Sequence, residues 1–277
     1  MRIGLDVSQH QLTWDEIVER SRFAEEAGFH GVWVFDHFQA LYGDPSGPCF
    51  EGWSLLASIA AITNRVRLGT LVTGVTYRHP SILASQAVTV DHVSGGRLEL
   101  AVGAAWNAKE HNELGLDFPS IPERARRLEE AVQMFRLLMT EDDVTFDGRH
   151  YRLDHATYRP RPVQEPHPPI WIGATGEQLM LPIVGRRADV WHGFGHVDDL
   201  RRKSRIVDEH AGKAGRDPAS IERSTNLSLS DPWDQVRARA EALKEAGFSY
   251  LVASWPSEGK GRLDEFVSDV MPEITAG

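Results

Sequence analysis

Arg97-Leu-Glu-Leu-Ala-Val-Gly103 is one of eight short runs of β-branched and aliphatic residues in this chain. Six of the seven gaps between these runs are about one helix long. Short apolar runs that alternate with amphipathic helices predict a parallel sheet, and eight β/α units in 277 residues fit a closed (β/α)₈ TIM barrel of the α/β class. Such barrels hold their chemistry at the C-terminal ends of the strands, so residues that follow each run are candidate site residues. The runs are Arg2–Val7, Gly31–Phe35, Val66–Gly74, Arg97–Gly103, Ile170–Gly173, Asp189–Phe194, Ser224–Leu229 and Tyr250–Trp255.

The repeat is interrupted between the fourth and fifth runs. Pro122–Met139 has the apolar spacing of an amphipathic helix, and Asp147-Gly148 is a hairpin signal. A hairpin of this size cannot have a core of its own. We therefore expect residues 1–277 to form a single barrel domain with a small helix and hairpin excursion between strands 4 and 5.

Composition narrows the classes of partner. The net charge of −10 argues against a nucleic-acid ligand, and Leu55–Ile62, the longest apolar stretch, is far shorter than the ~20 residues of a membrane span. Cys49 is the single cysteine, which excludes an internal disulfide and fits a reducing compartment. The chain also enters a predicted strand at Arg2, without a leader-like segment. We expect a cytoplasmic protein with no nucleic-acid or membrane partner.

Gly173-Ala174-Thr175-Gly176 follows the fifth predicted strand and precedes a helix predicted over Glu177–Gly185. Glycines allow a ligand to approach backbone N–H groups closely, and a helix N-terminus adds donors with positive dipole character. The residues alone are equally compatible with a phosphate site and with a plain glycine turn.

Asp36-His37 ends the second predicted strand. Histidine is suited to proton transfer near neutral pH, and a neighbouring carboxylate can fix its tautomer. The alternative is a histidine packed at the barrel rim. His192 and His196 are four residues apart, but the glycines between them disfavour a helix that presents both, so we expect no catalytic metal.

Two Trp-containing pairs also follow strands, Trp106-Asn107 after the fourth and Trp191-His192 after the sixth. Aromatic side chains at a barrel mouth can form walls around a planar ligand, and asparagine can read a carbonyl-imide edge. The alternative is that these tryptophans cap the core.

Several longer motifs occur in a fixed order over residues 1–195. They are Ala27-Gly-Phe-His-Gly-Val-Trp-Val34 with Asp36-His37-Phe38, Thr63-Asn-Arg-Val-Arg-Leu-Gly-Thr70, Tyr77-Arg-His-Pro80, Asp91-His-Val-Ser-Gly-Gly-Arg97, Gly103-Ala-Ala-Trp-Asn107, Phe146-Asp-Gly-Arg-His-Tyr151 and Pro168-Pro-Ile-Trp-Ile-Gly-Ala174. In order and spacing they resemble the luciferase-like monooxygenase superfamily, and within it the group that depends on the deazaflavin coenzyme F420.

The resemblance implies a bacterial luciferase-like barrel that binds F420, or alternatively FMN, in its C-terminal mouth, and a homodimer. A cis non-prolyl peptide bond is implied at Leu71-Val72, with Val72-Thr73 as the alternative. His37 matches a proton donor beside the reacting ring. The implied cofactor contacts are Asp36, Leu71, Val72, Thr73, Trp106, Asn107, Gly173, Ala174, Thr175, Gly176, Trp191 and His192.

The resemblance favours an F420-dependent oxidoreductase that passes a hydride between the deazaflavin and a small organic substrate. An FMNH₂-dependent monooxygenase and a non-catalytic flavin-binding barrel are the alternatives. Related sugar-phosphate dehydrogenases carry a glutamate just after strand 4, where this chain has Trp106, and Glu110 lies one helical turn further on. This difference argues against a sugar-phosphate substrate.

Overall fold

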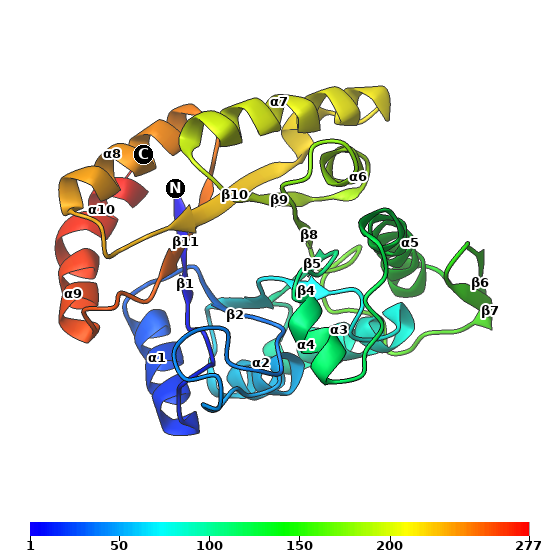
Figure 1. Ribbon diagram of the computed structural model, residues 1–277, viewed down its shortest axis with the longest axis horizontal. Helices are drawn as coiled ribbons and strands as arrows, with labels where there is room; N and C mark the ends of the chain where they lie inside the picture. The colour runs from blue at the N-terminus through cyan, green and yellow to red at the C-terminus, as the bar shows by residue number, and fades with distance from the viewer. Residues whose placement is uncertain (277) are drawn as a thin grey trace.

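A computed structural model describes residues 1–276 of the protein and contains a closed barrel of parallel strands surrounded by helices (Figure 1). The strand order is β3-β2-β1-β11-β10-β9-β8-β5-β4, and pairing of β3 with β5 closes the ring. β3 and β4 are two pieces of the third predicted strand, separated at residues 71–72. The predicted TIM barrel is therefore confirmed. Its strands are β1 (Arg2–Asp6), β2 (Gly31–Val34), β3 (Arg67–Thr70), β4 (Thr73–Gly74), β5 (Leu98–Gly103), β8 (Ile170–Gly173), β9 (Val190–Gly193), β10 (Glu222–Leu227) and β11 (Tyr250–Ser254).

Local sequence signals set the ends of several helices. Thr13 and Glu16 form a reciprocal capping box at the start of α1, and Gly95, with φ of 66°, ends α3 in the left-handed conformation that glycine adopts without cost. Among residues 1–276, no helix combines the length and apolar character needed to cross a bilayer. The helices are α1 (Trp14–Glu26), α2 (Gly52–Ile62), α3 (Pro80–Ser94), α4 (Ala108–Glu113), α5 (Ile121–Thr140), α6 (Met180–Arg187), α7 (Val197–Lys213), α8 (Trp233–Glu245), α9 (Lys260–Glu265), a π-helical turn (Phe266–Val270) and α10 (Met271–Thr275).

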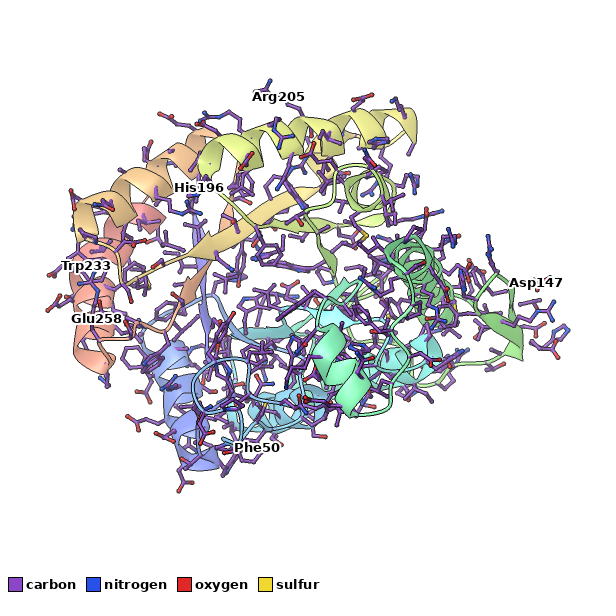
Figure 2. All side chains as sticks on the ribbon, in the orientation of Figure 1. Phe50, Asp147, His196, Arg205, Trp233 and Glu258 are labelled. Carbon is purple, nitrogen blue, oxygen red and sulfur yellow. The ribbon has the colours of Figure 1, made fainter. Side chains whose placement is uncertain are left out.

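The predicted excursion between the fourth and fifth barrel strands is present. β6 (Val144–Asp147) and β7 (Arg152–Ala156) form an antiparallel hairpin beyond α5, and Asp147 lies at the outer edge of the molecule (Figures 1 and 2). The Glu130 carboxylate on α5 accepts hydrogen bonds from the backbone amides of residues 149–151. This carboxylate holds the turn of the hairpin against the barrel.

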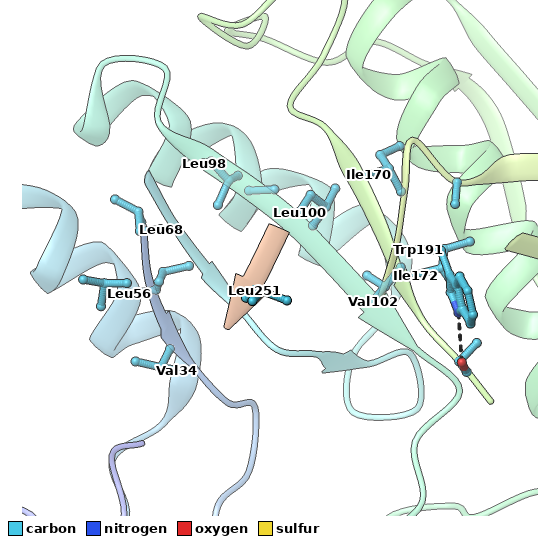
Figure 3. Packing of buried hydrophobic residues seen from close by; sticks show 14 of the residues in the cluster. Val34, Leu56, Leu68, Leu98, Leu100, Val102, Ile170, Ile172, Trp191 and Leu251 are labelled. Atoms are coloured by element: carbon cyan, nitrogen blue, oxygen red, sulfur yellow. Dashed lines mark hydrogen bonds between the residues drawn. The ribbon is translucent and has the colours of Figure 1, made fainter. Parts of the chain in front are cut away.

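The apolar core has an outer and an inner part. The outer part lies between strands and helices and includes Leu68, Leu100 and Ile172 (Figure 3). The inner part lies inside the barrel and is built on fully buried Trp33 and Tyr250, whose side chains hydrogen-bond at 3.1 Å. Leu71 and Val72 pack on the inner part, together with Trp171. These side chains fill the barrel below Leu71 and Val72, and a cavity lies above them, toward the C-terminal ends of the strands.

Candidate active site

A cavity of about 500 Å³ lies at the C-terminal ends of the barrel strands. This volume is in the range of small-molecule sites. Most of the predicted site residues line it, and four do not, namely Thr73, Asn107, Trp191 and His192. The predicted residues that line the cavity are Asp36, His37, Leu71, Val72, Trp106, Gly173, Ala174, Thr175 and Gly176.

The turn Gly173–Gly176 carries the chain from β8 toward α6. The Gly176 carbonyl accepts hydrogen bonds from the amides of Met180 and Leu181, so a hydrogen-bonded turn leads from Gly176 into α6 at Met180. The amide of Ala174 is already bonded to the His192 carbonyl at 3.1 Å. Thr175 and Gly176 are exposed residues, and their amides have no acceptor within residues 1–276. Two free amides in the turn that precedes α6 suit the phosphate of a cofactor.

His37 is held by a buried carboxylate, Glu110, which the sequence pattern placed near the site without giving it a role. Its Nδ1 lies 2.8 Å from Oε2 of Glu110, on α4, and the Tyr77 hydroxyl donates to the same carboxylate. The other Glu110 oxygen accepts from the amides of Phe38 and Gln39, at 2.8 and 3.1 Å. Glu110 therefore fixes both the histidine ring and the loop that follows it.

The charge of Glu110 determines which nitrogen of His37 is available. Burial alone would raise the pKa of Glu110, but hydrogen bonds from His37, Tyr77 and the Phe38 amide outweigh it and lower the pKa to about 2. Since the ionised carboxylate accepts only, Nδ1 of His37 carries a proton directed at Glu110. Nε2 of His37 has no partner within residues 1–276 and is the nitrogen available to a ligand.

The buried Glu110 carboxylate predicts a pH-dependent contribution to stability. A carboxylate with a lowered pKa stabilises the fold above its ordinary value of 4.5, and the contribution is lost as pH falls toward 2. We expect Glu110→Gln to lower the free energy of unfolding on the order of 3 kcal/mol near neutral pH. Urea titrations of both proteins should show this gap narrowing below about pH 4.5. A gap that stays constant under acidic conditions would contradict the assignment.

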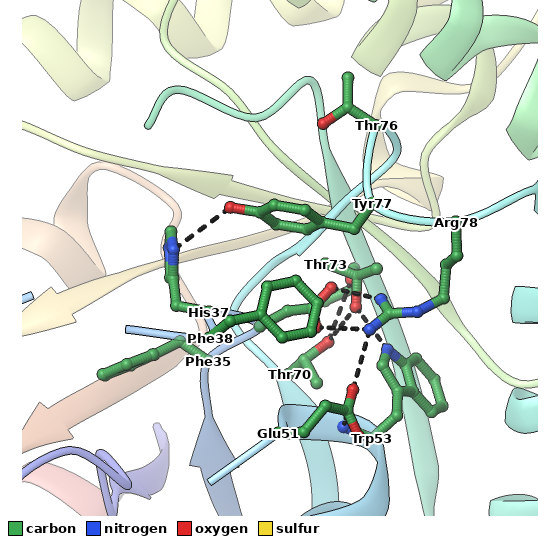
Figure 4. Close-up of polar contacts among 12 residues, drawn as sticks. Phe35, His37, Phe38, Glu51, Trp53, Thr70, Thr73, Thr76, Tyr77 and Arg78 are labelled. Atoms are coloured by element: carbon green, nitrogen blue, oxygen red, sulfur yellow. Dashed lines mark hydrogen bonds and ion pairs between the residues drawn. The ribbon is translucent and has the colours of Figure 1, made fainter. Parts of the chain in front are cut away.

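Asp36 lines the cavity, and its carboxylate is bound by Arg78. Arg78 contacts both of its oxygens, at 2.5 and 2.9 Å, and also contacts Glu51 at 2.9 Å (Figure 4). Burial favours a neutral guanidine, but the two carboxylates outweigh it and raise the pKa of Arg78. Arg78 is thus committed to this pair, which fixes the orientation of Asp36.

The bulge between β3 and β4 forms one wall of the cavity. The peptide bond between Leu71 and Val72 is cis, so the position implied by the resemblance is confirmed. A Cβ on Gly173 would lie 2.8 Å from Val72, which shows how closely β8 approaches this bulge. Thr73 turns away from the cavity, and its hydroxyl bonds to Thr70 at 2.6 Å and to Trp53 at 2.9 Å (Figure 4).

Trp106 and Asn107, which follow β5, have different surroundings. Trp106 is 66% exposed on the cavity wall, and its ring centroid lies 5.6 Å from that of His37. Asn107 does not line the cavity, because it caps α4 by accepting from the Glu110 amide at 3.2 Å. The expected cofactor contact by Asn107 is replaced by an indirect role, since this cap places the helix that carries Glu110.

Trp191 does not shape the mouth, and this expectation requires correction. It is fully buried among outer core residues, and its indole N–H donates to the Ala174 carbonyl at 3.0 Å (Figure 3). Successive side chains of a strand point to opposite faces, so Val190 faces the barrel interior and Trp191 faces the helices. The same alternation would have excluded Trp191 at the sequence level.

His192 faces inward but lies below the cavity. It is fully buried, with Nδ1 3.0 Å from the Ser224 hydroxyl and Nε2 3.1 Å from Oδ1 of Asn226. Burial lowers the pKa of His192 to about 3, so it is neutral. His192 therefore positions Asn226, which does line the cavity and which the sequence analysis missed.

Other residues of the site were also missed. Glu110 and Tyr77 are absent from the predicted set, and so are Asp6, the last residue of β1, and Ser8, both of which line the cavity. Position at a strand end would have suggested Asp6 and Ser8, whereas Glu110 lies on a six-residue helix with no periodic signal. Within residues 1–276, no three His, Cys, Asp or Glu side chains gather as a metal site.

Comparison with known proteins gives a consistent picture. A family model described as luciferase-like monooxygenase matches residues 1–248. An F420-dependent glucose-6-phosphate dehydrogenase of Nakamurella multipartita is 37% identical over 269 residues, covering 94% of this chain and 76% of the relative. An F420-dependent hydroxymycolic acid dehydrogenase of Mycobacterium tuberculosis is 30% identical over 244 residues, covering 87% of this chain and 66% of the relative.

Solved structures share the fold. An F420-dependent secondary alcohol dehydrogenase in complex with an F420-acetone adduct matches with a TM-score of 0.89 over 99% of both chains. At 22% sequence identity, this likeness concerns the architecture alone. The family match and the identity to curated relatives agree with the resemblance drawn from the motifs. The chain belongs to the luciferase-like monooxygenase family.

Proposed function

We propose that this protein is an F420-dependent oxidoreductase that transfers a hydride between the deazaflavin and a small organic substrate. The curated relatives described above, all named as F420-dependent dehydrogenases, support the cofactor. The observation that carries the proposal is His37 on the cavity wall, held by Glu110 through Nδ1 with Nε2 left available. A histidine in this arrangement can move a proton to or from a substrate when a hydride is transferred.

The residues at one side of the cavity suit the cofactor. The amides of Thr175 and Gly176 would bind its phosphate, and Leu71-Val72 would support its ring, with Asp36 and Trp106 as further contacts. Bound there, F420 would supply the hydride chemistry, while the protein supplies orientation and electrostatics.

His37 would act as the proton donor or acceptor at Nε2. Glu110 keeps Nδ1 protonated and stabilises the imidazolium that forms when Nε2 takes up a proton. Tyr77 completes the hydrogen bonds of this carboxylate, and burial together with Glu110 raises the pKa of the Tyr77 hydroxyl, which keeps it protonated. Glu110 and Tyr77 are thus positioning residues.

A binding titration tests the choice of cofactor. We expect purified protein, titrated with F420 and with FMN in both redox states, to bind F420 more tightly. The family description leaves an FMNH₂-dependent monooxygenase as the second candidate. Tighter binding of FMN accompanied by oxygen uptake would favour that alternative, and cofactor binding without turnover of any alcohol or carbonyl compound would favour a non-catalytic flavin-binding barrel.

Gly176→Asp is expected to weaken F420 binding by about tenfold or more, because a carboxylate would face the cofactor phosphate. The side chain can be accommodated, since its Cβ would meet only the flexible Met180 side chain, at 3.3 Å. Gly212→Asp on α7 is the matched control, because nothing lies within 4 Å of its Cβ. Fluorescence titration of F420 measures both. Equal affinities in the two variants would place the phosphate elsewhere.

We further propose that residues 1–277 act as one domain, and that the enzyme is a cytoplasmic homodimer without nucleic-acid or membrane partners. The net charge of −10 and the single cysteine support the compartment and the absence of nucleic acid. Light scattering of the purified protein at several concentrations would test the dimer.

A further inference from the structure

The cavity offers no positive side chain to an anionic substrate. Among the described residues that line it there is no Lys or Arg, the acidic ones are Asp6 and Asp36, and burial raises the pKa of both carboxyl groups. Glu110 lies behind His37. A phosphorylated substrate would therefore enter a region without a cationic partner and with nearby carboxylates. Binding of an anionic group here is disfavoured, because the anion loses hydration and the lining supplies no cation in exchange.

Within residues 1–276, two arginines hydrogen-bond to lining residues, and both are held by other contacts. Arg78 is bound to Asp36 on both carboxylate oxygens. Arg124 donates to the Ala104 carbonyl at 2.9 Å, and its guanidinium lies 3.9 Å from the centroid of the Phe118 ring. Moving either arginine toward a ligand would break these contacts, so neither compensates for the missing charge.

The accessible walls of the cavity are largely apolar. Tyr42 is 71% exposed, Trp106 is 66% exposed and Phe194 is 38% exposed, and all three line the cavity together with the partly exposed Leu41. Exposed aromatic side chains that share one cavity indicate a binding surface for apolar groups. A neutral ligand with a hydrocarbon body would cover this surface.

We propose that the substrate is a neutral, largely apolar alcohol or the corresponding carbonyl compound, and that it is not a sugar phosphate. This inference rests on the proposed function and specifies the substrate class of the same site. In the oxidative direction, the carbinol C–H bond breaks and its hydride passes to the oxidised deazaflavin. The O–H bond breaks as the C=O bond forms, and the proton passes to Nε2 of His37. The alcohol loses two electrons, which the deazaflavin gains.

Calorimetric titration of the F420-loaded protein tests the inference without relying on turnover. We expect cyclohexanol to bind at least about tenfold more tightly than glucose 6-phosphate at the same ionic strength. Trp106→Ala and Tyr42→Ala should each weaken cyclohexanol binding by about threefold or more, whereas Trp106→Phe should retain it. Trp14→Ala, which removes an exposed tryptophan from α1, is the matched control and should change nothing.

A variant that adds a positive charge to the lining tests whether the missing cation is what disfavours a phosphorylated substrate. Leu41→Lys adds a cation to the lining and should raise the affinity for glucose 6-phosphate by about tenfold. Tight F420 binding with preferential binding of glucose 6-phosphate by the unaltered protein would overturn the substrate class alone. Failure of F420 to bind would overturn the proposed function, and the substrate class with it.

Discussion

Replacing His37 by alanine is expected to lower kcat by a factor of about 10²–10⁴ while leaving F420 affinity within about threefold. The reason is that His37 is the titratable side chain whose free nitrogen faces the cavity, whereas the proposed phosphate contacts are backbone amides on another strand. Steady-state kinetics with an apolar alcohol measures the first effect, and fluorescence titration with F420 measures the second.

His155→Ala is the control for this variant. His155 lies on the hairpin strand β7, is exposed and contacts Asp143 outside the cavity. Its replacement should leave both kcat and cofactor affinity unchanged. Unchanged turnover in His37→Ala would remove the proton-transfer role and with it the mechanism proposed for this site.

The second large effect is expected for Glu110→Gln, which should lower kcat by about 10²-fold. The amide cannot stabilise a protonated imidazole as a carboxylate does, and its NH₂ group would present a donor toward Nδ1. The pH profile of kcat should therefore also change, because the negative charge beside the proton-transferring ring is removed. A purely structural role for Glu110 would leave that profile unchanged.

Glu113→Gln is the matched control because Glu113 lies on the same helix, α4, is exposed and pairs with Lys109 at 2.8 Å. This variant should keep the rate and the pH profile of the unaltered enzyme. A Glu110→Gln enzyme with reduced kcat but an unshifted profile would contradict the electrostatic role and leave only a loss of packing.

The barrel could be predicted from sequence because its strands are short, β-branched and separated by regular helices. The break in the third strand could not be predicted from the same apolar pattern. Nothing in the residues of Val66–Gly74 themselves requires a cis peptide bond, and its position came from the family resemblance. The start of α6 was placed too early because Gly176 begins a turn before the regular helix at Met180.

The site was predicted less completely than the fold, for two physical reasons. Position at a strand end identifies residues near the mouth, but the alternation of side chains along the strand decides which of them point into the barrel. For this reason His192 points inward, whereas Trp191 points toward the helices. Pairing between distant segments is not visible in a single sequence. His37 and Glu110 are 73 residues apart, and the helix that presents Glu110 is too short to show a period.

A crystal structure of the protein with F420 tests the central claim most directly. We expect the cofactor phosphate within hydrogen-bonding distance of the Thr175 and Gly176 amides, its ring against Leu71-Val72, and Nε2 of His37 directed at the reacting face. A cofactor bound outside this cavity, or a ring that lies away from His37, would contradict it.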